Sequence, residues 1–415
     1  MSEATEQTAR RTEPSMTTEA YISMAEDYGA HNYHPLPVVI AAAEGPWVYD
    51  PEGRRYLDML SAYSAINQGH RHPHIIRALK EQADRVTLTS RAFHNDQLGP
   101  FLKQLSELSG FSRVLPMNTG AEAVETGVKA ARKWAYTVKG VPEGQAEIIV
   151  AAGNFHGRTT TIVSFSTEAQ YRAGFGPFTP GFKVVPYGDL AALRAAFTPN
   201  TAAFLVEPIQ AEGGILLPPP GYLEEARALC TANQALLFFD EIQTGLGRTG
   251  RMFCFEHHDL RPDCVVLGKA LGGGVYPVSA FLADDPVMSV FHPGDHGSTF
   301  GGNPLAAAVA RASLEVLVGE RLDERSAALG AHAMARLAAI DAPQITQVRG
   351  RGLLIGLELD GPARGTCERL MQRGVLCKET HENVIRFAPA LTITQADLDW
   401  GLDQVEAVLT SGAYA

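Results

Sequence analysis

The stretch ALLFFDE, residues 235–241, is an apolar run that ends in acid, and a second run, PDCVVLGKA at residues 262–270, carries Lys269 near its end. Apolar residues at successive positions are typical of a parallel strand that is buried on both faces. Each strand would deliver one ionisable side chain, Asp240 or Lys269, at its carboxyl end. Ligands of open α/β sheets bind in the crevice outside those ends. The two runs therefore predict a parallel sheet with a binding site at its carboxyl edge.

The two ionisable residues also indicate a cofactor. An aspartate can hold the protonated nitrogen of a pyridine ring, and a lysine can form an imine with an aldehyde. Those two roles define a site for pyridoxal 5'-phosphate, PLP. Taken alone, either residue would more often cap a buried strand at the surface. The three glycines at 272–274 favour the site, because glycine lets the backbone lie close to a bound group.

Composition narrows the classes of function. The chain has 415 residues and a net charge of −11, with 46 acidic and 35 basic side chains mixed along it. We therefore expect no nucleic-acid partner, since the basic stripe of such proteins is missing. We also expect no membrane span, which needs roughly 20 apolar residues in a row. The five cysteines form no CxxC pair, which predicts reduced thiols and a cytoplasmic protein.

The order of apolar runs predicts four segments. Residues 1–18 are polar and lack the apolar core of a signal peptide, so we expect a disordered leader. Apolar runs alternate with helical patterns over 64–308, which predicts a large α/β domain with a mostly parallel sheet. Residues 309–415 read as a smaller α+β domain. The strand-like segment within 19–63 is expected to pack on that smaller domain.

Two loops have the residues of a phosphate site. Thr119 follows a strand and is a plausible helix N-cap, so the free amides of Gly120 and Ala121 would face outward at the positive end of a helix. An ordinary capped helix is an equally good interpretation of this segment alone. Ser298 and Thr299 lie in a small polar loop whose hydroxyls also suit a phosphate.

Further candidate side chains follow other predicted strands. Phe155 could stack on a flat ring, and Arg158 could receive a substrate carboxylate in a forked pair. Glu207 and Glu212 lie beyond another strand and share the presumed catalytic edge with Asp240. Gln243 could reach the phenolic oxygen of the cofactor. The histidines at 70, 72 and 74 lie beside a proline without matching cysteines, so we predict a turn and no metal site.

Together these motifs resemble the class III, fold-type-I PLP-dependent aminotransferases over nearly all of the chain after about residue 25. The matching motifs are NTGAEA at 118–123, Glu207-Pro208, DEIQTG at 240–245, Gly268-Lys269 and GSTFGGNP at 297–304. Within that family the likeness is to members that act on ornithine. It rests on residues 28–37, 63–70, 87–93 and 385–389. The implied fold has a large domain with a mostly parallel seven-stranded sheet and a smaller α+β C-terminal domain.

The resemblance assigns roles to residues. It implies that Lys269 and Asp240 are catalytic, with Lys269 carrying the cofactor and Asp240 holding the pyridine nitrogen. The implied cofactor-binding residues are Gly120, Ala121, Phe155, Glu207, Asp240, Gln243, Lys269, Ser298 and Thr299, with Thr299 coming from a partner subunit. The implied substrate-binding residues are Tyr33, Tyr63, Arg158, Glu212 and Arg386. Of these, Arg386 would bind the α-carboxylate of glutamate, and Glu212 would pair with it when ornithine is bound.

The reaction implied is transfer of the δ-amino group of ornithine to 2-oxoglutarate, which gives glutamate 5-semialdehyde and glutamate. A relative that uses N-acetylornithine, 4-aminobutyrate or the ε-amine of lysine is the alternative, and Tyr33 is the residue expected to discriminate. A non-catalytic protein with the same fold is a second alternative. The resemblance further implies a homodimer, or a dimer of dimers, with the active site at the subunit interface. His156 stands where animal relatives have a bulky aromatic residue.

Overall fold

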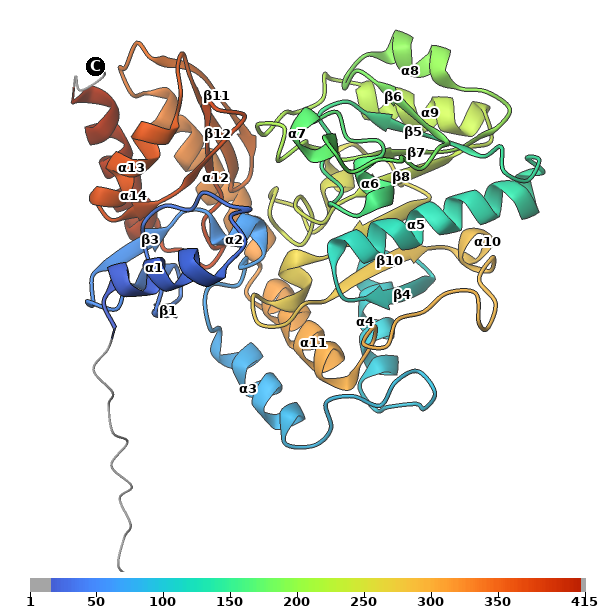
Figure 1. Cartoon of the computed structure of the whole chain (residues 1–415), viewed down its shortest axis with the longest axis horizontal. Coiled ribbons are helices and arrows are strands. Elements are labelled where there is room, and N and C mark those ends of the chain that lie inside the picture. Colours follow the sequence, from blue (N-terminus) through green and yellow to red (C-terminus); the bar gives the residue numbers. More distant parts are fainter. Residues whose placement is uncertain (1–15, 412–415) are drawn as a thin grey trace, which may run out of the picture.

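The computed structural model describes residues 16–411, which form two lobes (Figure 1). Residues 1–15 of the expected leader lie outside the described residues. The first helix, α1 (Thr18–Tyr28), begins within the expected leader, because the Thr17 hydroxyl accepts a hydrogen bond from the amide of Ala20 and caps the helix. Helical structure therefore begins at Thr18, the last residue of the segment expected to be a leader.

The large lobe is built on a seven-stranded sheet, which confirms the predicted fold class. Its strand order is β4-β10-β9-β8-β7-β5-β6. Only β10 runs antiparallel to its two neighbours, and the other paired strands are parallel. The strands are β4 (Arg113–Met117), β5 (Glu147–Ala151), β6 (Phe182–Val185), β7 (Thr201–Val206), β8 (Leu236–Asp240), β9 (Cys264–Leu267) and β10 (Ser279–Ala283). The apolar runs at residues 235–241 and 262–270 contain the adjacent strands β8 and β9.

Helices cover both faces of this sheet. Strand β8 is buried throughout, and its side chains alternate between two hydrophobic clusters: Leu237 and Phe239 join one, and Phe238 joins the other. Gly127 lets helix α5 approach β8, since a Cβ there would lie 2.2 Å from the Phe238 ring. The main helices of this lobe are α3 (Pro73–Ala83), α4 (Leu98–Ser109), α5 (Gly120–Trp134), α8 (Leu190–Ala196), α9 (Tyr222–Ala232) and α11 (Pro304–Gly319).

The small lobe contains residues from both ends of the described chain. Its antiparallel sheet has the order β11-β12-β15-β14, and a second sheet has the order β1-β2-β3-β13. Because β3 pairs in parallel with β13, the N-terminal strands share a sheet with the C-terminal part of the chain. The strands are β1 (Ala42–Glu44), β2 (Trp47–Tyr49), β3 (Arg55–Asp58), β11 (Ile345–Arg351), β12 (Leu354–Leu359), β13 (Val375–Leu376), β14 (Lys378–Thr380) and β15 (Val384–Phe387). The helices are α12 (Leu322–Ala338), α13 (Arg364–Gln372) and α14 (Gln395–Thr410).

The expected boundary at residues 308 and 309 falls inside helix α11. That helix continues to Gly319 and packs against α3 and α4 of the large lobe. We therefore propose that the small domain begins after Gly319. Among the described residues, no helix combines the length and the apolar character that crossing a membrane requires.

Candidate active site

The carboxyl ends of three parallel strands meet at one cavity. Asp240 ends β8, Lys269 follows β9, and Glu207 follows β7. The cavity has a volume of about 200 Å³. It is lined by Gly120, Ala121, Phe155, His156, Gly157, Glu207, Asp240, Ile242, Gln243, Thr244 and Lys269. Seven of the residues expected to bind the cofactor therefore lie together: Gly120, Ala121, Phe155, Glu207, Asp240, Gln243 and Lys269.

Two hydrogen bonds hold the carboxylate of Asp240. Nδ1 of His156 donates to Oδ2 at 2.7 Å, and the amide of Ile242 donates to Oδ1 at 3.0 Å. Both Asp240 and His156 are buried. His156 is a site residue that sequence reasoning missed as a partner of Asp240. The available signal was its position directly after Phe155, in a loop that follows a strand of the same sheet.

Lys269 is an amine with altered basicity. Burial lowers its pKa to about 8, although the nearby carboxylates of Glu212 and Asp240 oppose that shift. Its backbone has a φ of +45°, a left-handed conformation, at the first residue of the short turn Lys269–Gly272. A buried lysine with a lowered pKa is neutral more often at physiological pH, so it can act as a nucleophile or as a base.

Glu207 anchors the loop that carries Phe155. The amide of Phe155 donates to Oε2 of Glu207 at 3.0 Å. Burial and the neighbouring charge of Asp240 raise the pKa of Glu207 well above its ordinary value. The guanidinium of Arg158 lies 4.1 Å from the ring centroid of Tyr171 and 5.8 Å from that of Phe155. Arg158 is therefore held by aromatic faces near the cavity, as a cation–π contact permits.

Helix α5 points its N-terminus at the cavity. Thr119 is the N-cap, as predicted from the sequence. Its hydroxyl accepts from the amide of Glu122, and the Glu122 carboxylate accepts from the amide of Thr119 at 2.7 Å. This capping box leaves the amides of Gly120 and Ala121 without partners inside the helix. They form a suitable seat for a phosphate group.

A partly buried ion pair lies between the two lobes, with the side chain of Arg386 2% exposed and that of Glu212 24% exposed. Arg386 of β15 donates from Nη1 to Oε1 of Glu212 at 2.7 Å and from Nη2 to Oε2 at 3.2 Å. Burial alone would raise the pKa of Glu212, but the charge and hydrogen bonds of Arg386 lower it to about 2. The ring of Tyr63 lies 4.7 Å from the guanidinium carbon. Gln243 also donates to Glu212, at 3.0 Å, so it bridges the pair and the cavity.

Tyr63 is carried by an unusual turn. Residues Ser61, Ala62, Tyr63 and Ser64 all have positive φ, between +45° and +72°, and none is glycine. A left-handed conformation costs an ordinary residue roughly 1–2 kcal/mol. Strain of this kind gathers at functional sites. Its place beside the Glu212–Arg386 pair fits that rule.

Three expected residues lie apart from the cavity in this single chain. Tyr33 has 71% of its surface exposed. It nevertheless lies near Tyr63, because burial raises the pKa of the Tyr63 phenol and Tyr33 adds a smaller contribution in the same direction. Thr299 is exposed. Ser298 accepts a hydrogen bond from the side-chain amide of Asn118, at 2.8 Å, just before the phosphate seat.

The cavity suits PLP. Asp240 can hold a pyridine nitrogen, Lys269 can bind an aldehyde, and the start of α5 can hold a phosphate. Gln243 Oε1 and Thr244 Oγ1 are buried, line the cavity and have no hydrogen-bond partner among the described residues. Buried polar atoms without partners are costly, so they indicate a polar ligand.

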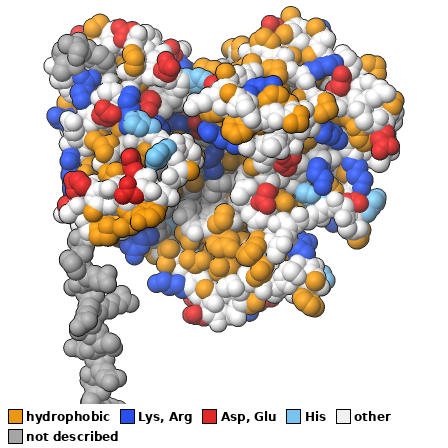
Figure 2. All heavy atoms as spheres, viewed as in Figure 1, with side chains coloured by type: hydrophobic (Ala, Val, Ile, Leu, Met, Phe, Trp, Pro, Cys, Tyr) orange, Lys and Arg blue, Asp and Glu red, His pale blue; other side chains and the backbone are white. Residues whose placement is uncertain are grey.

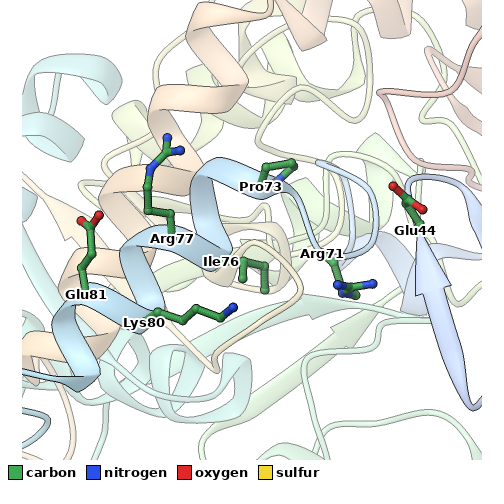
Figure 3. Close-up of a pocket in the computed structure, with 7 residues that line it drawn as sticks. All are labelled: Glu44, Arg71, Pro73, Ile76, Arg77, Lys80 and Glu81. Atoms are coloured by element: carbon green, nitrogen blue, oxygen red, sulfur yellow. The ribbon is translucent and has the colours of Figure 1, made fainter. Parts of the chain in front are cut away.

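A second hollow of about 380 Å³ lies along helix α3 (Figure 3). Its walls are Glu44, Arg71, Pro73, Ile76, Arg77, Lys80 and Glu81, which carry charges of both signs. None of the residues expected from the sequence lines it. The expected histidines His70, His72 and His74 pair with three different carboxylates, and no cluster with the makeup of a metal site occurs within residues 16–411.

Comparison with known proteins identifies the family. The sequence model described as aminotransferase class-III matches residues 28–409. An ornithine aminotransferase of Brevibacillus brevis is 62% identical over 392 residues, which cover 94% of this chain and 98% of the relative. The structure of the ornithine aminotransferase from Toxoplasma gondii ME49 is 45% identical with a TM-score of 0.93, covering 95% of this chain and 96% of that chain. An acetylornithine aminotransferase of Elizabethkingia anophelis is 49% identical with a TM-score of 0.89, covering 95% and 99%.

These matches extend across both lobes and include the strands that deliver Asp240, Lys269 and Arg386. The family model, the curated relatives and the solved structures agree on the same class of enzyme. The cavity supplies the acid, the amine and the phosphate seat that such an enzyme needs. The chain belongs to the class-III aminotransferase family.

Proposed function

We propose that this protein transfers the δ-amino group of L-ornithine to 2-oxoglutarate and so forms glutamate 5-semialdehyde and L-glutamate. The ion pair between Glu212 and the buried Arg386 is the observation that carries this proposal. Relatives named ornithine aminotransferase at about 60% identity support it. The Elizabethkingia relative, named for acetylornithine, keeps N-acetylornithine as the second candidate donor.

The two half-reactions present a geometric problem. Ornithine must present its terminal amine, whereas glutamate must present the amine next to its α-carboxylate. A free Arg386 would clamp any α-carboxylate in a forked pair and thereby bring the α-amine of ornithine to the cavity. Glu212 occupies both donors of that fork. The pair thus hides the receptor from ornithine and can open for 2-oxoglutarate and glutamate, which is specificity by exclusion as well as attraction.

As a class-III aminotransferase, the protein uses PLP, which supplies an aldehyde and an electron-accepting ring when bound. Asp240 would keep the proton on the ring nitrogen, and His156 and the amide of Ile242 orient its carboxylate. Lys269 would hold the aldehyde carbon and, once released, could move protons at the reacting carbon because its pKa lies near 8. Phe155 would cover one face of the ring. Gly120 and Ala121 would hold the phosphate.

We also propose that the active unit is a homodimer to which each subunit lends Thr299. Large apolar side chains are exposed at Val86, Leu88, Phe93 and Phe300. Figure 2 shows hydrophobic side chains gathered beside the hollow between the lobes. Helix α1 has no buried residue, and a helix of 11 residues is marginal without packing. A second copy of the chain would cover the exposed apolar side chains and would give helix α1 a surface to pack against. The five cysteines are buried thiols without disulfides, which supports a cytoplasmic location.

A donor panel tests the proposed substrate. Ornithine, N-acetylornithine, 4-aminobutyrate and lysine are each supplied with 2-oxoglutarate, and formation of glutamate and of the semialdehyde is followed. We expect kcat/KM for ornithine to exceed that for every other donor by at least about tenfold, or ~1.4 kcal/mol. The Lys269→Ala variant serves as the inactive control. A higher kcat/KM with N-acetylornithine would replace the proposed donor with that one.

The lowered pKa of Lys269 predicts a pH profile for cofactor capture by the apoprotein. Only the neutral amine can attack an aldehyde, so the rate should rise with pH, pass its midpoint near 8 and then level off. With a lysine of ordinary pKa, the rate would keep rising until about pH 10.4. Stopped-flow absorbance after mixing apoprotein with PLP measures this rate. A rate that still rises steeply above pH 9 would contradict the lowered pKa.

Removing Glu212 should affect the two half-reactions unequally. In Glu212→Ala the guanidinium of Arg386 is unmasked, so we expect the glutamate half-reaction to accelerate by about tenfold, or ~1.4 kcal/mol. The ornithine half-reaction should gain nothing. Single-turnover absorbance of the bound cofactor measures both. Glu379→Ala is the matched control, because Glu379 bonds Lys378 at 2.8 Å and not Arg386. Equal changes in both half-reactions would reduce Glu212 to a structural role.

A further inference from the structure

The turn that carries Tyr63 has a backbone conformation that its residues do not favour. Residues Ser61–Ser64 form a left-handed turn without a glycine, and Ala62 within it is exposed. Nothing in the side chains of this sequence favours that conformation, since only glycine adopts it without cost. Strained backbone persists only where surrounding contacts over-determine it. Contacts around this turn must therefore hold it in the left-handed conformation.

Asp58 holds the start of the turn. Its Oδ1 accepts hydrogen bonds from the amides of Leu60, at 2.9 Å, and Ser61, at 2.8 Å. Its Oδ2 accepts from Nε2 of His70 at 2.9 Å. Asp58 is itself buried at the end of β3. One carboxylate thus fixes the backbone that enters the turn and ties it to the segment that follows the turn.

Both sides of the turn are also tied to the chain just after Arg386. The amide of Ala388 donates to the carbonyl of Met59 at 2.7 Å, and the amide of Leu391 donates to the carbonyl of Asn67 at 2.8 Å. The turn and strand β15 therefore share one rigid frame. Within that frame the Tyr63 ring faces the guanidinium of Arg386.

We propose that Asp58 is a positioning residue for the carboxylate receptor, which holds the left-handed turn so that Tyr63 stays against Arg386. The inference rests on the proposed function, since that function makes Arg386 the receptor. Without Asp58 the two amides lose their acceptor, and the turn can relax towards ordinary backbone conformations. Tyr63 would then leave the guanidinium, and Arg386 would lose one wall of its site. Asp58 acts only through Tyr63 and has no contact with the cavity.

Binding of glutarate, a dicarboxylate without an amino or oxo group, tests this in the PLP-loaded enzyme by calorimetry. We expect Asp58→Ala to raise the Kd of glutarate by about tenfold, or ~1.4 kcal/mol. Asp58→Asn keeps an acceptor for both amides and should stay within about twofold of the wild type. Asp50→Ala is the matched control, because Asp50 likewise accepts from a backbone amide, that of Arg54, in the neighbouring turn of the same sheet. It should leave the Kd unchanged.

Substitutions at the exposed Ala62 test the turn without touching Asp58. Valine is branched at Cβ and resists a left-handed conformation, whereas glycine accepts it. Ala62→Val should therefore weaken glutarate binding, and Ala62→Gly should not. Wild-type affinity in both Asp58→Ala and Ala62→Val would overturn the inference, and so would equal loss in Ala62→Val and Ala62→Gly. If Asp58→Ala does not fold, the comparison of Ala62→Val with Ala62→Gly tests the inference by itself.

The outcome is separable from that of the donor panel. Glutarate carries no amine, so a donor other than ornithine would overturn the proposed function and leave these comparisons valid. Conversely, normal ornithine turnover together with unchanged glutarate affinity in the variants would overturn only the role of Asp58.

Discussion

The guanidinium of Arg386 is almost completely out of water, and the carboxylate of Glu212 balances its charge. The pair joins the loop after β7 in the large lobe to strand β15 in the small lobe. The same loop makes further contacts with the small lobe, since Thr380 donates to the carbonyl of Glu212 and Arg349 to that of Gly214. Moving Glu212 away without a replacement would leave the buried charge of Arg386 uncompensated, which costs free energy. The pair therefore opens at low cost only when another carboxylate replaces Glu212, as a dicarboxylate substrate would under the proposed function.

The parallel sheet supplies the other half of the site. Because β7, β8 and β9 are neighbours and point the same way, Glu207, Asp240 and Lys269 meet at one edge. Their closeness and burial then set their chemistry. Burial favours the neutral form of Lys269, whereas hydrogen bonds keep Asp240 aligned as an acceptor. The fold thus produces a weakened base beside a fixed carboxylate, which are the two groups that PLP chemistry requires.

Much of this arrangement was predictable from the sequence because it depends on local patterns. Continuous apolar runs predicted β8 and β9, and Thr119 shortly after a strand predicted the capped start of α5. The bond between His156 and Asp240 was not predictable, since it depends on a loop after β5 reaching across to β8. The left-handed turn at Tyr63 contains no glycine and so leaves no sequence signal. The boundary expected after residue 308 falls inside α11, which continues as one helix to Gly319. Tyr33 and Thr299 are exposed and lie apart from the cavity, and the roles expected of them stay predictions.

The exchange of anions at Arg386 is the central claim, and a crystal structure of the PLP-loaded enzyme with glutarate tests it most directly. The account predicts that a carboxylate of glutarate accepts both Nη donors of Arg386 and that Glu212 has moved away from the guanidinium. It also predicts that the unliganded crystal keeps the Glu212–Arg386 pair. A complex in which glutarate is bound in the cavity while Glu212 still holds Arg386 would contradict the account.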